Sequence, residues 1–157
     1  MFGLFSSKPI EDEQLGELRR SGGYWRGSLL LEPCGTFALV LAGGREAPDP
    51  THLRLSKELP DRFVSLMPDI QTGLFEHYAP YKEAVDAGEE TDSPCPSVAS
   101  PDEVWQHIMP AHILVERLQG APTIEIGFRT SWDIEHTLGA RFQGWQLVEL
   151  NGSVRGR

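Results

Sequence analysis

Cysteines and basic residues are scarce in the sequence, and each shortage excludes a class of protein. The two cysteines, Cys34 and Cys95, lie far apart, so the close pairs of a zinc ribbon or a thioredoxin-type redox motif are absent and free thiols are expected. The 157 residues include 14 basic and 23 acidic residues, which give a formal net charge of −9. A field of that sign repels nucleic-acid phosphates and anionic lipid. We therefore expect no nucleic acid and no membrane as partners, and a basic protein is the partner that the charge favours.

Long apolar runs and nucleotide-binding motifs are missing as well. No run of 18 apolar residues predicts a membrane span, and the N-terminus lacks the basic start and apolar centre of a secretory signal, so a cytoplasmic protein is expected. Gly22-Gly23 and Gly43-Gly44 are not followed by the helix, lysine or third glycine that would grip a phosphate. We expect no cofactor and no metal.

The composition is that of one globular domain covering residues 1–157. Residues 1–22 are predicted to be a partly ordered N-terminal arm, because Ile10, Leu15 and Leu18 are its only apolar points after the first few residues; a helical turn or a docking arm is the most they predict. Residues 88–100 are rich in serine, proline and acidic residues, which predicts a mobile loop.

Strands are predicted on both sides of a helical region. Residues 25–32 and 36–42 form an N-terminal hairpin, closed by a turn in which Gly35 supplies a positive φ. A C-terminal antiparallel meander is predicted, with strands at 112–118, 123–129, 140–142 and 145–150. In the second of these strands isoleucine and phenylalanine alternate with Glu125 and Gly127, which is typical of one buried and one wet face.

Helical periodicity occupies the middle of the chain. One apolar stripe follows spacings of three and four residues and comprises Phe63, Leu66, Met67, Ile70, Leu74 and Tyr78. Pro68 lies inside this stripe and is expected to kink or divide the helix. Ser100 to Glu103 form a capping box that predicts a short helix containing Trp105. The expected fold class is α+β: a mostly antiparallel sheet packed against one long amphipathic helix and a short one.

The segment "SWDIEH" places ionisable side chains close together, and it allows three interpretations. As a metal site, Asp133, Glu135 and His136 would need a further ligand from His107 or His112. As acid–base machinery, the histidine beside carboxylates could serve as a general base, although no nucleophile motif accompanies it.

The third interpretation of this segment is a structural turn at the exit of a strand. Asp133 would cap the turn by accepting backbone N–H groups, while Trp132 and Ile134 would be buried. Glu135 and His136 would then lie at the surface. This interpretation requires no missing ligand or nucleophile, so we favour it.

Four segments in this order resemble a family of uncharacterised bacterial proteins: "LGELRRSGGYWRG", "LFEHYAPYKEA", "VWQHI" and "WDIEHTLGARFQGWQLVELNGSV". The motif positions here are Gly16, Leu18, Trp25, Gly27, Tyr78, Trp105, Trp132, Asp133, Glu135, His136, Gly139, Phe142, Asn151 and Gly152. Looser relatives with a similar ending resemble small immunity proteins that neutralise secreted toxins. The resemblance thus implies a single α+β domain that binds a protein.

Two functional hypotheses follow. The first is a small acidic cytoplasmic protein that binds another protein, in the manner of an immunity protein or an inhibitor. The second is a small hydrolase or metal-dependent enzyme centred on Asp133, Glu135 and His136.

Overall fold

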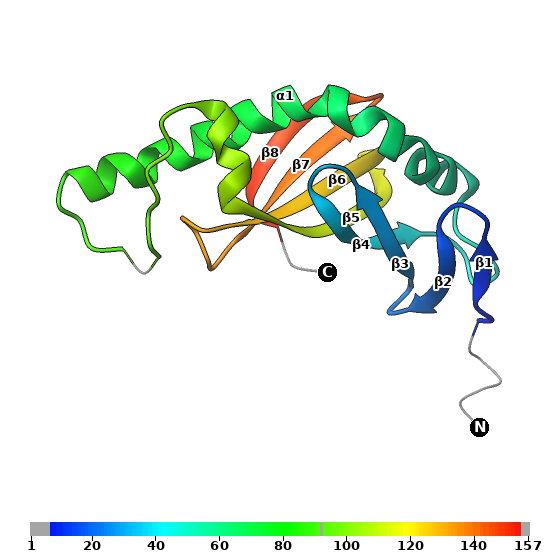
Figure 1. Ribbon diagram of the computed structural model, residues 1–157. Coiled ribbons are helices and arrows are strands. Elements are labelled where there is room, and N and C mark those ends of the chain that lie inside the picture. The colour runs from blue at the N-terminus through cyan, green and yellow to red at the C-terminus, as the bar shows by residue number, and fades with distance from the viewer. Residues whose placement is uncertain (1–6, 92, 155–157) are drawn as a thin grey trace.

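The chain folds into a single curved sheet with a long helix on one face (Figure 1). The computed structural model describes residues 7–91 and 93–154. The elements in this part of the chain are β1 (Ile10–Asp12), β2 (Gly16–Ser21), β3 (Tyr24–Leu31), β4 (Gly35–Ala42), α1 (Pro50–Asp86), the short 3₁₀ helix η2 (Pro101–His107), β5 (Ile108–Leu118), β6 (Ala121–Thr130), β7 (Thr137–Gln143) and β8 (Gln146–Val154). The predicted α+β class is confirmed.

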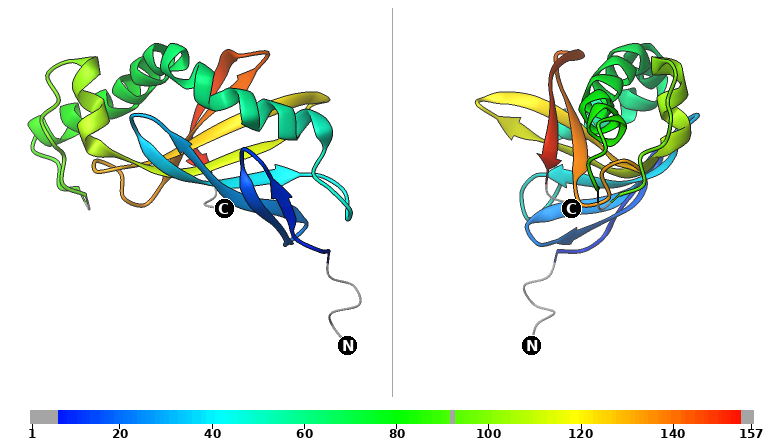
Figure 2. Two further views of the ribbon diagram at one scale, coloured as in Figure 1. Left: turned by 45° about the vertical axis from the view of Figure 1, so that its right-hand side comes forward. Right: turned by 90° about the vertical axis from the view of Figure 1, so that its left-hand side faces the viewer.

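The eight strands of the described sheet lie in chain order, from β1 to β8. Neighbouring strands are antiparallel except β4 and β5, which are parallel because α1 and η2 connect them across one face. Figure 2 shows α1 on that face, with β7 and β8 beside it in the right-hand view. The predicted N-terminal hairpin is confirmed as β3 and β4, and Gly35 in its turn has a φ of 124°.

Helix α1 packs the predicted apolar stripe against the sheet; all of its members are buried except Met67, which is partly buried. Asp49 caps the helix by accepting the N–H groups of Thr51 and His52. Pro68 was expected to kink or divide the helix; division is wrong, since α1 runs unbroken through three prolines, and a kink stays a prediction. Pro68 lacks the N–H that would bond to the Val64 carbonyl, but Val64 is exposed, so water can satisfy that oxygen.

The core lies between α1 and the inner face of the sheet. Phe37 of β4 contacts Phe63 of α1 and Phe128 of β6, with ring centroids 6.5 and 5.7 Å away, both edge to face. All three rings are fully buried, so they join the helix to the middle of the sheet.

Residues 10–12 and 16–21 form strands, so the expected helical turn is wrong for them, whereas a role in docking stays a prediction. Asp12 shapes the turn between these strands, because its carboxylate accepts the N–H groups of Gln14 and Leu15 at 2.8 and 2.9 Å. Leu18 is fully buried, and Gly27 of β3 leaves the space that its side chain fills. Residues 1–6 of the predicted arm lie outside the described part.

Two further expectations concern exposure and mobility. The alternation along β6 predicted a wet face, and this is wrong for Glu125, which is 4% exposed. The mobility of residues 88–100 stays a prediction, and Asp92 within them is not among the described residues. None of the described helices has the length and hydropathy required to cross a membrane.

Candidate functional site

The turn after β6 is organised by the carboxylate of Asp133. This side chain is 5% exposed, and it accepts the Tyr81 hydroxyl at 2.7 Å and the Nδ1–H of His136 at 2.9 Å. Burial by itself raises the pKa of Asp133, but the hydrogen bonds from Tyr81 and His136 outweigh it and hold that pKa below its ordinary value. Asp133 is therefore an ionised group that joins the turn to α1.

His136 is oriented by the same carboxylate. Because an ionised carboxylate only accepts, the proton of neutral His136 lies on Nδ1 and its Nε2 is left as a free base. The His136 side chain is half exposed at a shallow hollow of about 140 Å³, which Glu135 and Ser93 also line. Ser93 accepts the N–H of Ile134 at 3.1 Å, and no hydrogen bond between Ser93 and His136 occurs in the described part of the chain. The hollow holds an oriented base without an attached nucleophile.

A second histidine, His77 of α1, lies beside this turn. The indole N–H of Trp132 donates to its Nδ1 at 3.0 Å, and its ring lies 5.4 Å from that of Tyr81. Gly152 of β8 is next to the ring on the other side, where a Cβ would lie 2.9 Å from Nε2. Burial lowers the pKa of His77, so the neutral form that accepts from Trp132 is favoured.

His77 also belongs to an open groove between α1 and β8, about 630 Å³ in volume. We call this the α1–β8 groove; its lining residues are Asp69, Thr72, Gly73, Glu76, His77, Leu147 and Leu150. Gly73 makes the close approach of the two elements feasible, since a Cβ there would lie 2.9 Å from the Leu150 side chain. At the tip of the β7–β8 hairpin, Arg62 of α1 stacks on Trp145 at 4.6 Å from the ring centre. Two contacts therefore hold α1 close to the β7–β8 hairpin: one at the floor of the groove, between Gly73 and Leu150, and one at the hairpin tip, between Arg62 and Trp145.

The structure settles which predicted site residues meet. Asp133 and His136 are in contact, and Glu135 is exposed beside them. The histidine next to this turn is His77, through its contacts with Trp132 and Tyr81, whereas His112 bonds to Glu125 and His107 lines a different hollow. Trp132 is buried as expected, but the predicted burial of Ile134 is wrong, because its side chain is 65% exposed. Within residues 7–91 and 93–154, no group of three or more His, Cys, Asp and Glu side chains is placed to hold a metal ion.

A buried polar network that the sequence did not predict lies on the sheet face opposite α1. The Glu125 carboxylate accepts hydrogen bonds from His112 Nε2 at 2.7 Å and from Arg141 Nε at 2.9 Å. Arg141 also donates a hydrogen bond to Glu149 at 2.8 Å. Burial alone raises the pKa of Glu125, but these two partners outweigh it and the pKa is lowered. A Cβ on Gly127 would lie 2.4 Å from the His112 ring, so that glycine makes room for the pair. Glu125 lies opposite Arg141 in neighbouring strands, and this register, which the structure alone shows, brings the opposite charges together.

The remaining motif residues have structural surroundings. Trp25 and Phe142 are buried, and the indole N–H groups of Trp25 and Trp105 donate to Gly44 O and Gln71 Oε1. Tyr78 is buried and donates to a backbone carbonyl in the segment before η2. Gly139 pairs with Gly127 and with Asn151 across β7. These positions support the sheet and the turn.

Both cysteines are free thiols. Burial raises the pKa of Cys34 to about 11 and also raises that of Cys95. Neither thiol is therefore activated as a nucleophile at neutral pH.

Fold and site together define a small α+β protein with an open groove beside an edge strand and an oriented Asp–His pair. The chain belongs to a family defined by a domain of unknown function, DUF6985, whose model matches residues 34–154. This confirms the expected membership of an uncharacterised family, and the matched segment contains the α1–β8 groove and the Asp133 turn. No curated protein and no solved structure matches the chain.

Proposed function

We propose that the protein is a protein-binding module of the cytoplasm whose binding surface is the α1–β8 groove. The observation that carries the proposal is that an open groove of about 630 Å³ runs along an edge strand. β8 is the last strand of the sheet and pairs only with β7 among the described strands. An edge strand offers unpaired backbone groups to an added strand, which is a common way to bind an extended peptide.

The side chains of the groove define the partner. Leu147 and Leu150 form an apolar floor, while exposed Asp69 and Glu76 stand two helical turns apart on α1. No lysine or arginine is among the residues that line the groove. A segment that alternates apolar and basic side chains is complementary to this surface, and the net charge of −9 would speed its approach.

A finer form of the proposal is that the bound partner is inhibited, as by an immunity protein. Support comes from the acidic charge and from the resemblance described above. An acidic module that occupies the basic surface of a nuclease-like or similarly basic partner would block that surface by charge and by contact.

The experiment is an affinity capture from lysate of the organism that carries the gene, at moderate salt, with three forms of the protein. The groove variant is Asp69→Lys/Glu76→Lys. The control is Glu11→Lys/Asp61→Lys, which makes the same change in net charge at exposed positions outside the groove. We expect a partner that the wild type and the control capture equally and the groove variant loses by at least about tenfold. Equal capture by all three forms, or no partner at all, would contradict the proposal.

A second candidate function rests on the oriented base. The Asp133–His136 pair, with Nε2 of His136 free at a hollow, is the arrangement of a general base. Screening ester and phosphoester substrates with the wild type, His136→Ala and Glu135→Ala tests it. Turnover that His136→Ala abolishes and Glu135→Ala retains would favour the enzyme over the binding module. Absence of turnover across the screen would leave the binding module as the better account.

A further inference from the structure

A separate hollow lies where β5 begins and β6 ends. It shares no lining residue with the α1–β8 groove. It has a volume of about 380 Å³, within the range of small-molecule sites. We call it the β5–β6 hollow; its lining residues are Gln106, His107, Ile108, Met109, Arg129, Thr130, Ser131 and Ile134.

The apolar wall of this hollow is exposed although its backbone is held in place. Met109 and Ile134 are 58% and 65% exposed. The N–H of Ile134 is bound by Ser93, and the preceding N–H, of Asp133, donates to Thr130 Oγ1 at 3.2 Å. Two large apolar side chains at fixed, solvent-facing positions indicate a surface that a ligand covers.

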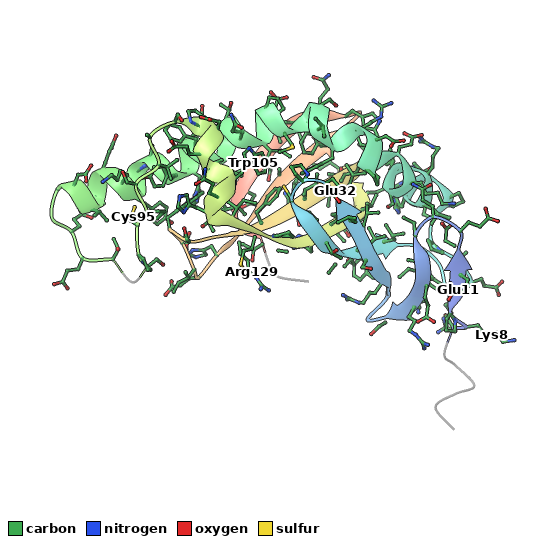
Figure 3. The ribbon with its side chains drawn as sticks, viewed as in Figure 1. Lys8, Glu11, Glu32, Cys95, Trp105 and Arg129 are labelled. Carbon is green, nitrogen blue, oxygen red and sulfur yellow. The ribbon has the colours of Figure 1, made fainter. Side chains whose placement is uncertain are left out.

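The polar groups of the hollow point to an anion. No acidic residue lines it, although the chain carries a net charge of −9. Arg129 is exposed, and its guanidinium has no ion pair or hydrogen bond with residues 7–91 and 93–154. It lies directly across from Met109 in the β5–β6 ladder. Figure 3 shows Arg129 on the side of the sheet away from α1, whereas Trp105 lies beside α1. An unpaired guanidinium next to an apolar wall is suited to a carboxylate attached to an apolar body.

A second polar group of the hollow lacks a partner. The hydroxyl oxygen of Ser131 is shielded from solvent and has no hydrogen bond in the described structure. Buried hydroxyl groups are usually hydrogen-bonded, but this oxygen is out of reach of a water-sized group, so the site proposed here does not depend on it. Thr130, by contrast, already exchanges hydrogen bonds with the backbone of Asp133.

We propose that the β5–β6 hollow binds a small monocarboxylic acid with an apolar body, its carboxylate on Arg129 and its apolar part against Met109 and Ile134. This site is independent of the α1–β8 groove, so either proposal can fail alone. Phosphate esters fit it less well, because the wall is apolar and Arg129 is its only permanent cation.

The test is an NMR titration of the full chain with octanoate as the probe and octanamide as its uncharged counterpart. We expect octanoate to bind with a Kd of about 1 mM, as its size allows, with shifts confined to the lining residues. Octanamide should bind about fivefold more weakly because it lacks the charge that meets Arg129.

Variants separate the carboxylate contact from general binding. Arg129→Gln should weaken octanoate about fivefold and leave octanamide unchanged, whereas Arg117→Gln, the same change at an exposed arginine on the far end of β5, should alter neither. Ile134→Ser should weaken both probes equally. Equal affinity for octanoate and octanamide, shifts elsewhere on the protein, or no binding at 10-fold the expected Kd would each overturn the proposal.

Discussion

Asp133 and Glu135 are carboxylates two positions apart with opposite surroundings. Asp133 is buried and holds Tyr81 and His136, whereas Glu135 is exposed at the rim of a hollow. From the residues alone, the burial of Trp132 was predictable. The Asp133 carboxylate bonds to the side chains of Tyr81 and His136, and Thr130 Oγ1 accepts a backbone N–H of the turn, so capping by Asp133 stays a prediction. The contact with Tyr81 was not predictable, since it joins positions 52 residues apart.

Replacing Asp133 tests this difference at the scale of one residue. Asp133→Ala should lower the free energy of unfolding by about 2 kcal/mol, because hydrogen bonds to a charged acceptor are lost and their donors stay partly buried. Glu135→Ala is the matched control and should change it by less than about 0.5 kcal/mol. Urea denaturation measures both, and equal losses would show that Asp133 does not organise the turn.

At the scale of elements, β1 and β2 were the hardest to predict. Their apolar residues are few, and neither strand has a clear alternating pattern. The strands form because Leu18 fills a space left by Gly27 and because β2 pairs with the edge of β3. The stripe on α1 was predictable from its spacing, whereas its passage through Pro68 depended on which side of the helix faces water.

Leu18→Ala tests whether β2 is part of the core. We expect the free energy of unfolding to fall by about 2–5 kcal/mol, the usual cost of a cavity at a fully buried leucine. Val64→Ala, at an exposed apolar position of α1, should change it by less than about 0.5 kcal/mol. Similar stabilities of the two variants in urea denaturation would mean that β1 and β2 are an appended arm.

The whole molecule should lose stability on acidification in two stages. The pKa of His77 lies below its ordinary 6.5 in the folded state, so the unfolded chain binds the proton first and stability starts to fall as pH drops below about 6.5. The lowered pKa values of Asp133 and Glu125 act later: their contribution is full above the ordinary values of 3.8 and 4.5 and is lost as pH falls through the folded values.

His77→Gln separates the two stages. Thermal melts between pH 8 and 5 should show a falling Tm for the wild type and a smaller fall for this variant, because Gln carries no proton-binding site. His107→Gln, outside the α1–β8 groove, is the control and should fall as the wild type does. An undiminished fall in His77→Gln would assign the first stage to another group.

The sequence by itself determined the α+β class, the helical stripe, the two main strand regions and the absence of a close cysteine pair. Each of these depends on periodicity or spacing within a short stretch, because local helix or strand geometry fixes which side chains share a face. The tertiary structure alone decided that His77 joins the Asp133 turn, that Glu125 is buried with His112 and Arg141, and that Asp69 and Glu76 stand beside an edge strand. Those arrangements bring together residues from separate elements, and their positions depend on how α1 packs across the sheet rather than on any local pattern.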